Sequence, residues 1–101
     1  MEKLFDYEKL KVYQVSLDFV EWAGDLLLMI DKKISACEQL DRASTSIPLN
    51  IAEGNGKFTS KDKCHFFDIS RGSALECSAC LDVLVRRKKV ESKDIIQGKK
   101  C

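Results

Sequence analysis

The fold of this chain is decided by the stretch Ser46-Ile47-Pro48-Leu49-Asn50-Ile51-Ala52-Glu53-Gly54-Asn55-Gly56. Pro48 stands inside an apolar pattern of helical period, where a proline removes one backbone hydrogen bond and costs about 3 kcal/mol. The hydroxyl residues 44–46 lie just before it, and such side chains can bond to freed carbonyls and bend the helix. Gly54 and Gly56 are expected to end the helix in the left-handed conformation. The pattern predicts one helix over residues 35–54.

Helical periods also govern the residues before this stretch. A first helix is predicted over residues 8–31, because its apolar residues recur at spacings of three and four. The stripe consists of Leu10, Tyr13, Leu17, Val20, Gly24 and Leu27. The second helix is expected to begin with a capping box, in which Ser35 is the N-cap and Glu38 reaches back to it.

A third helix is predicted over residues 59–89, with Thr59 as its N-cap. Its seam has a strict four-three alternation, and small residues in such a seam let two helix backbones approach closely. The seam consists of Phe66, Ser70, Ser73, Cys77, Cys80 and Leu84. A short fourth helix is expected over residues 92–98, capped by Ser92, with Ile95 and Ile96 as its only apolar residues.

These patterns predict a single all-α domain over residues 1–101, an antiparallel up-down helical bundle of three long helices plus a short or truncated fourth. The first and third helices are apolar on more than one side, so each needs more than one neighbour. The short fourth helix cannot cover these apolar faces. An apolar groove is therefore expected beside Trp22, Leu26, Phe67 and Leu81. Because such grooves usually mark interaction sites, the chain is expected to form a homo-oligomer. The alternative is that the native chain is longer and its missing fourth helix fills the groove.

Cations are concentrated at the end of the chain, where residues 86–101 hold seven Lys or Arg and two Asp or Glu. Such a basic segment can contact RNA, DNA or a nucleoprotein, although a solvated helix end favoured by the helix dipole explains it as well. Few aromatic residues lie among the cations, which indicates salt-sensitive phosphate contact rather than base stacking. The candidate nucleic-acid-binding residues are Lys57, Lys61, Lys63, Arg86, Arg87, Lys88 and Lys89.

No secretory signal and no apolar run of membrane-spanning length are visible, so a cytoplasmic protein without a membrane partner is expected. The five cysteines are then expected to be reduced thiols. An alternative hypothesis makes the protein a metal- or thiol-dependent enzyme that uses Cys64, His65, Cys77 and Cys80. The seam position of Cys77 and Cys80 indicates instead small apolar residues, and no metal or other cofactor is expected.

Polar residues are also expected to meet between the second and third helices. Asn50 and Glu53 stand beside apolar positions of the second helix, while Arg71 and Glu76 lie in the small-residue part of the third. A structural polar network would explain all four, because such networks fix the register of packed helices. A binding role for Glu53 and Arg71 is the functional alternative.

Three segments in this order resemble the four-helix bundle family that includes the proteins encoded within intervening sequences of bacterial large-subunit ribosomal RNA genes and the accessory protein of diversity-generating retroelements. The segments are Leu10-Lys11-Val12-Tyr13-Gln14, the run from Arg42 to Gly54, and the run from Phe66 to Glu76. The resemblance implies a small bundle. For the retroelement protein it implies a ring-shaped homopentamer that binds nucleic acid and a reverse transcriptase.

The chain departs from that family pattern in three places. The connection between the first two helices is short and lacks the usual proline, Cys77 replaces a large aliphatic residue, and the fourth helix is cut to residues 92–101. No catalytic signature is present, and the resemblance implies no established activity for most members. The sequence therefore favours a non-enzymatic oligomeric adaptor or nucleic-acid-binding module.

Overall fold

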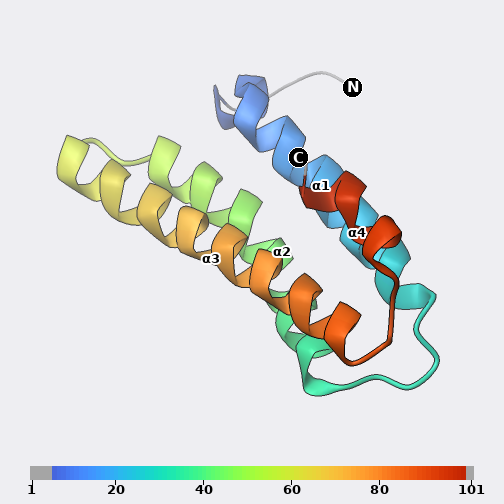
Figure 1. Cartoon of the computed structure of the whole chain (residues 1–101). Helices are drawn as coiled ribbons and strands as arrows, with labels where there is room; N and C mark the ends of the chain where they lie inside the picture. Colours follow the sequence, from blue (N-terminus) through green and yellow to red (C-terminus); the bar gives the residue numbers. More distant parts are fainter. Residues whose placement is uncertain (1–5, 100–101) are drawn as a thin grey trace.

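The computed structural model of the chain describes residues 6–99, and these residues form helices only. Both ends of the predicted domain, residues 1–5 and 100–101, lie outside the described residues. The all-α prediction is confirmed, and Figure 1 shows the arrangement. The elements are the short 3₁₀ helix η1 (Asp6–Lys9) and the α-helices α1 (Lys11–Leu28), α2 (Ser35–Asn55), α3 (Ser60–Arg86) and α4 (Ser92–Lys99).

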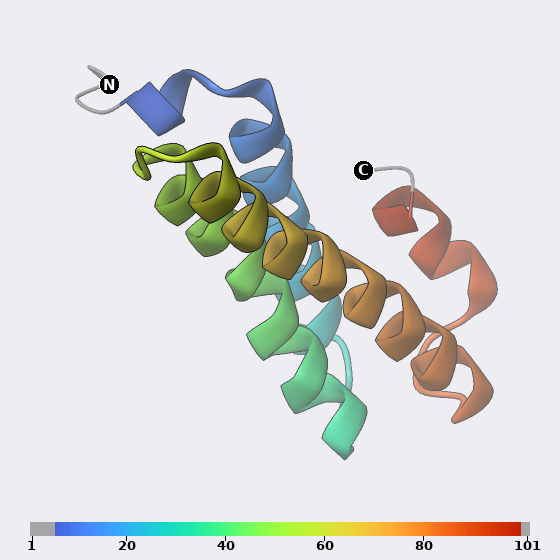
Figure 2. The ribbon, with the colours of Figure 1, turned by 90° about the vertical axis from the view of Figure 1, so that its left-hand side faces the viewer.

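α2 is the central element of the bundle. It packs along most of α3 and also along α1, whereas no Cα atoms of α1 and α3 approach within 8 Å of each other. The three long helices alternate in direction, so the α1–α2 and α3–α4 connections lie at the same end (Figure 1). α4 folds back from that end (Figure 2). It contacts both α1 and α3.

The apolar core is concentrated in the half of the bundle that contains these two connections. Its largest fully buried side chains are Leu40 from α2 and Leu81 and Leu84 from α3. α1 adds Phe19, Ala23 and Leu26, and α4 adds Ile95, all of them buried in the same cluster. Each large buried side chain contributes about 1.5–3 kcal/mol, so this half holds most of the hydrophobic stabilisation.

The other half depends on close packing between α2 and α3. Ser70 donates from its hydroxyl to the Ile47 carbonyl at 3.0 Å, and the hydroxyls of Ser73 and Ser46 lie 2.9 Å apart. These short side chains allow the two backbones to approach, as the small-residue seam predicted. α2 continues through Pro48, whose ring is buried against its neighbours.

Two of the three predicted N-caps are wrong. Ser35 is already the first residue of α2, and the preceding Ile34 has no side-chain hydrogen bond to the helix. α4 begins at Ser92, and Asp94 instead accepts from the backbone N–H of Glu91 at 3.0 Å. Only the Thr59 cap is confirmed, because its hydroxyl accepts from the Asp62 N–H at 3.1 Å.

The expected left-handed glycines are also wrong, because no described glycine has a positive φ. Gly56 ends α2 with φ −83° and ψ −5°, and its N–H donates to carbonyls of the last turn. The one left-handed residue between positions 6 and 99 is Lys88, with φ 59°. The Lys89 N–H donates to Leu84 and the Lys88 N–H to Val85, which is the Schellman pattern after a helix.

Gly54 is required for a different reason, which is its close contact with α3. A Cβ atom built there would lie 2.7 Å from Cε1 of Phe67 and 3.1 Å from Cβ of Phe66. Such distances are well inside van der Waals contact. Gly54 therefore sets the distance between the last turn of α2 and the first turns of α3.

Gly98 has the same role where α4 docks. A Cβ atom there would collide with the ring of Trp22, the single tryptophan of the chain. Lys99 adds an ion pair with Asp82 at 2.5 Å. The short α4 thus covers Trp22 and one end of the space between α1 and α3.

No helix in the described chain is long and apolar enough to cross a membrane.

We predict that Gly54→Val lowers the free energy of unfolding by about 1–3 kcal/mol, because the added carbons force α2 and α3 apart. Chemical denaturation followed by circular dichroism measures this. Gly72→Ala is the matched control, since nothing lies within 4 Å of its Cβ position in the same helix pair. That change should stabilise by about 0.5–1 kcal/mol through helix propensity. Equal stability of Gly54→Val and the native chain would show that α2 and α3 do not need this close contact.

Candidate functional site

An apolar groove runs between α1 and α3, and its floor is formed by α2. Its volume is about 670 Å³. The apolar side chains Val12, Phe67 and Leu75 line it and remain 58%, 39% and 64% exposed. Ile47 and Ile51 from α2 lie at its base, and Gly98 marks the end where α4 covers it.

The predicted groove is therefore present, but its lining differs from the expectation. Phe67 and Leu81 line it as expected. Leu26 is instead buried in the core, and Trp22 packs on Phe19 and under Gly98 of α4. The difference arises because Gly98 lets α4 pack closely on Trp22 of α1. A count of the apolar residues in α4 does not reveal this contact.

Two cations border this groove. Lys99 is held by its ion pair with Asp82, whereas Arg71 is exposed and forms no ion pair with another residue of the described chain. The groove thus combines an apolar lining with one cation at its edge, Arg71, that no described carboxylate neutralises. This composition suits an apolar surface of another protein chain better than a charged metabolite.

The expected polar network of Asn50, Glu53, Arg71 and Glu76 is not assembled. Asn50 donates within its own helix to the Ser46 carbonyl at 2.8 Å, and Glu53 pairs with Lys57 four residues later at 3.4 Å. Only Glu76 reaches across helices. The reason is geometric, because Arg71 and Glu53 lie on exposed faces and not between α2 and α3.

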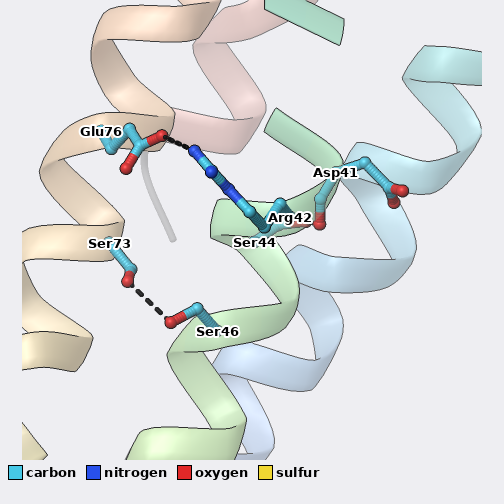
Figure 3. A network of polar contacts seen from close by, with 6 residues as sticks. All are labelled: Asp41, Arg42, Ser44, Ser46, Ser73 and Glu76. Carbon is cyan, nitrogen blue, oxygen red and sulfur yellow. Dashed lines mark hydrogen bonds and ion pairs between the residues drawn. The ribbon is translucent and has the colours of Figure 1, made fainter. Parts of the chain in front are cut away.

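Two contacts between side chains join α2 and α3 in place of that network (Figure 3). The guanidinium of Arg42 pairs with the carboxylate of Glu76 at 2.9 Å, and the hydroxyls of Ser46 and Ser73 bond to each other. The ion pair is largely solvent-exposed, so it contributes at most about 1 kcal/mol. The seam of small residues pointed to Ser73, but no spacing in the sequence pairs Arg42 with Glu76.

The predicted cationic residues form two clusters at opposite ends of α3. Lys57 lies in the α2–α3 turn and Lys61 and Lys63 in the first turn of α3, whereas residues 86–89 comprise the last residue of α3 and the turn that follows it. A helix of 27 residues separates them by about 40 Å. The seven residues therefore do not form one continuous surface on a single chain.

The four residues of the alternative enzyme hypothesis are likewise not brought together. Cys64 is exposed, as is His65, while Cys77 and Cys80 are buried in the core about 20 Å further along the same helix. Among residues 6–99, no three His, Cys, Asp or Glu side chains are placed to hold a metal ion.

The buried thiols also have the wrong acidity for nucleophiles or metal ligands. Burial raises the pKa of the Cys77 thiol to about 12, with smaller contributions from Cys80 and Glu76. Burial raises the pKa of Cys80 as well. A catalytic or ligating cysteine needs a lowered pKa, because its thiolate is the reactive form.

The Cys77 thiol predicts how stability changes in alkaline solution. Its pKa is higher in the folded chain than in the unfolded chain, so above about pH 9 the unfolded state binds fewer protons. The free energy of unfolding should therefore fall between about pH 9 and 12, with a contribution from Cys77 of at most about 1.4 kcal/mol per pH unit. Denaturation of Cys77→Ala over the same pH range is the control. An identical slope in both proteins would contradict a buried Cys77.

Comparison with known proteins identifies the chain's family. The model of the 23S rRNA-intervening sequence protein family matches residues 8–100, which is nearly the whole chain. No curated protein matches the chain closely enough to count as a relative. The family match agrees with the helical bundle and with the resemblance of the three quoted segments. The chain therefore belongs to the 23S rRNA-intervening sequence protein family.

Proposed function

We propose that the protein is a non-enzymatic helical-bundle module that forms a homo-oligomer and binds nucleic acid or a nucleoprotein. The observation that carries this proposal is the groove between α1 and α3, which is lined mainly by apolar side chains that remain exposed. The match to a family named for ribosomal RNA supports an RNA-related role. The cytoplasm is the compartment that this role implies.

Self-association is supported by the exposed lining of the groove. Val12, Phe67 and Leu75 together leave a large apolar area in contact with water. Burial of such area stabilises a complex by about 25 cal/mol per Å² before the cost of association is subtracted. A second copy of the chain is always present at equal concentration, so a face of this kind favours a symmetric assembly.

Nucleic-acid binding is supported by the turn that follows α3. Arg86, Arg87 and Lys88 are exposed, Lys89 is half-buried, and the Schellman turn holds their backbone in a fixed conformation. None of these four residues forms an ion pair with another residue between positions 6 and 99. Cations that are not neutralised by carboxylates can contact phosphates.

We predict that the native chain is larger than one chain mass in light scattering at micromolar concentration, and that Leu75→Glu reduces the mass. A carboxylate buried in an apolar interface loses its hydration, so the dissociation constant should rise at least about 10-fold. Leu28→Glu is the matched control, since Leu28 is 84% exposed and lies outside the groove. A stable particle of one chain mass for the native protein would contradict the proposal.

We also predict that nucleic-acid affinity falls steeply with salt and that replacement of residues 86–89 by Gln flattens this dependence. Removal of one phosphate contact should reduce the slope of log K against log salt by about 0.9 for a duplex. Fluorescence anisotropy of a labelled oligonucleotide at several salt concentrations gives the slope. The control replaces Lys32 and Lys93, which are exposed lysines near the same end. An unchanged slope in the residue 86–89 variant would show that this turn does not contact nucleic acid.

A further inference from the structure

The turn between α2 and α3 exposes one aromatic ring completely. Phe58 has a relative exposure of 102%, the highest among the exposed large apolar residues. Gly56 ends α2 and Thr59 caps α3, so Lys57 and Phe58 are the two residues that connect the helices. Neither cap needs an aromatic ring at position 58, and folding therefore does not explain Phe58.

Lysines flank Phe58 along the chain. Lys61 and Lys63 follow in the first turn of α3, and neither forms an ion pair with a described residue. Lys57 is held in place, because its ammonium group lies 3.4 Å from the Glu53 carboxylate and 4.9 Å from the centre of the Phe66 ring. The remaining carboxylate in this turn is Asp62, whose N–H belongs to the Thr59 cap.

We propose that this turn binds a single-stranded segment of nucleic acid, with Phe58 stacked on one unpaired base and Lys61 and Lys63 in contact with the adjoining phosphates. The proposal rests on the proposed nucleic-acid binding and assigns it a second, base-contacting surface. It revises the expectation that aromatic stacking has no part in binding. That expectation arose because the sequence did not show that Phe58 is the fully exposed aromatic residue.

Chemistry favours a single strand over other occupants. A free aromatic face next to cations matches a ligand that offers a flat base and a phosphate side by side, and unpaired bases can be splayed out for stacking. Bases of a duplex are already stacked inside the helix and cannot reach the ring. A lipid surface needs a broader apolar face, whereas the neighbours of Phe58 in the chain are polar.

The test measures anisotropy of a labelled oligouridylate of roughly 12 nucleotides and of an RNA duplex of the same length. Phe58→Ala should weaken single-strand binding about 5- to 100-fold and leave duplex binding unchanged. Phe58→Tyr should retain the affinity, whereas Phe58→Leu, which is apolar but cannot stack, should lose it as Ala does. Leu28→Ala is the control for an exposed apolar residue elsewhere. Because the Phe58 side chain is fully exposed, thermal unfolding of these variants should match the native chain.

Several outcomes would overturn the inference. Native affinity of Phe58→Ala for the single strand, equal losses for single strand and duplex, or full affinity of Phe58→Leu would each exclude stacking. A different result would assign the ring to a membrane. In that case the native chain binds vesicles of phosphatidylcholine and phosphatidylserine but not the single strand, and Phe58→Ala no longer binds the vesicles. If the native chain binds neither nucleic acid, the proposed function fails together with this inference. If the native chain binds and Phe58 has no effect, only this inference fails.

Discussion

The close packing of α2 on α3 is the interaction on which the rest of the structure depends. It is made by side chains that are small or absent, namely Gly54, Ser70 and the pair Ser46 and Ser73. Short side chains bring two backbones together, and the hydroxyls then bond across the gap to a carbonyl or to each other. The helix that contains Pro48 stays continuous because contacts of this kind hold it against its neighbour and compensate the hydrogen bond that the proline removes.

The groove is a consequence of the same packing. Because α2 lies between α1 and α3, each outer helix packs one face on α2, and the short α4 is the helix that contacts both outer helices on the other side. A helix with two apolar faces needs two neighbours, and α4 is only 8 residues long in the structure. α4 meets this need at the end where Gly98 packs on Trp22 and Ile95 enters the core. The apolar faces beyond Gly98 are not covered by any element of residues 6–99.

The sequence predicted the helices and the seam well, because periodic patterns average over many residues. Details that depend on one residue were predicted less well. The roles of Gly54 and Gly98 were missed, since a glycine required by a neighbouring ring looks the same in sequence as a glycine required by its own backbone angle. The polar contacts were missed for a similar reason, because the pairing of Arg42 with Glu76 depends on how two helices are aligned. The exposure of Phe58 could not be predicted from the sequence either, since apolar residues are normally assigned to the core.

The distribution of the core links stability to the candidate binding surfaces. The buried leucines and cysteines lie near the α1–α2 and α3–α4 connections, so residues 86–89 project from the most stable part of the bundle. The turn with Phe58 lies at the opposite end, where α2 and α3 pack closely through Gly54 on Phe66 and Phe67, and where α2 also contacts the short η1. Local opening is easiest where few apolar side chains are buried. Phe58 can therefore adjust to a ligand at little cost, whereas the basic turn presents its charges in a fixed arrangement.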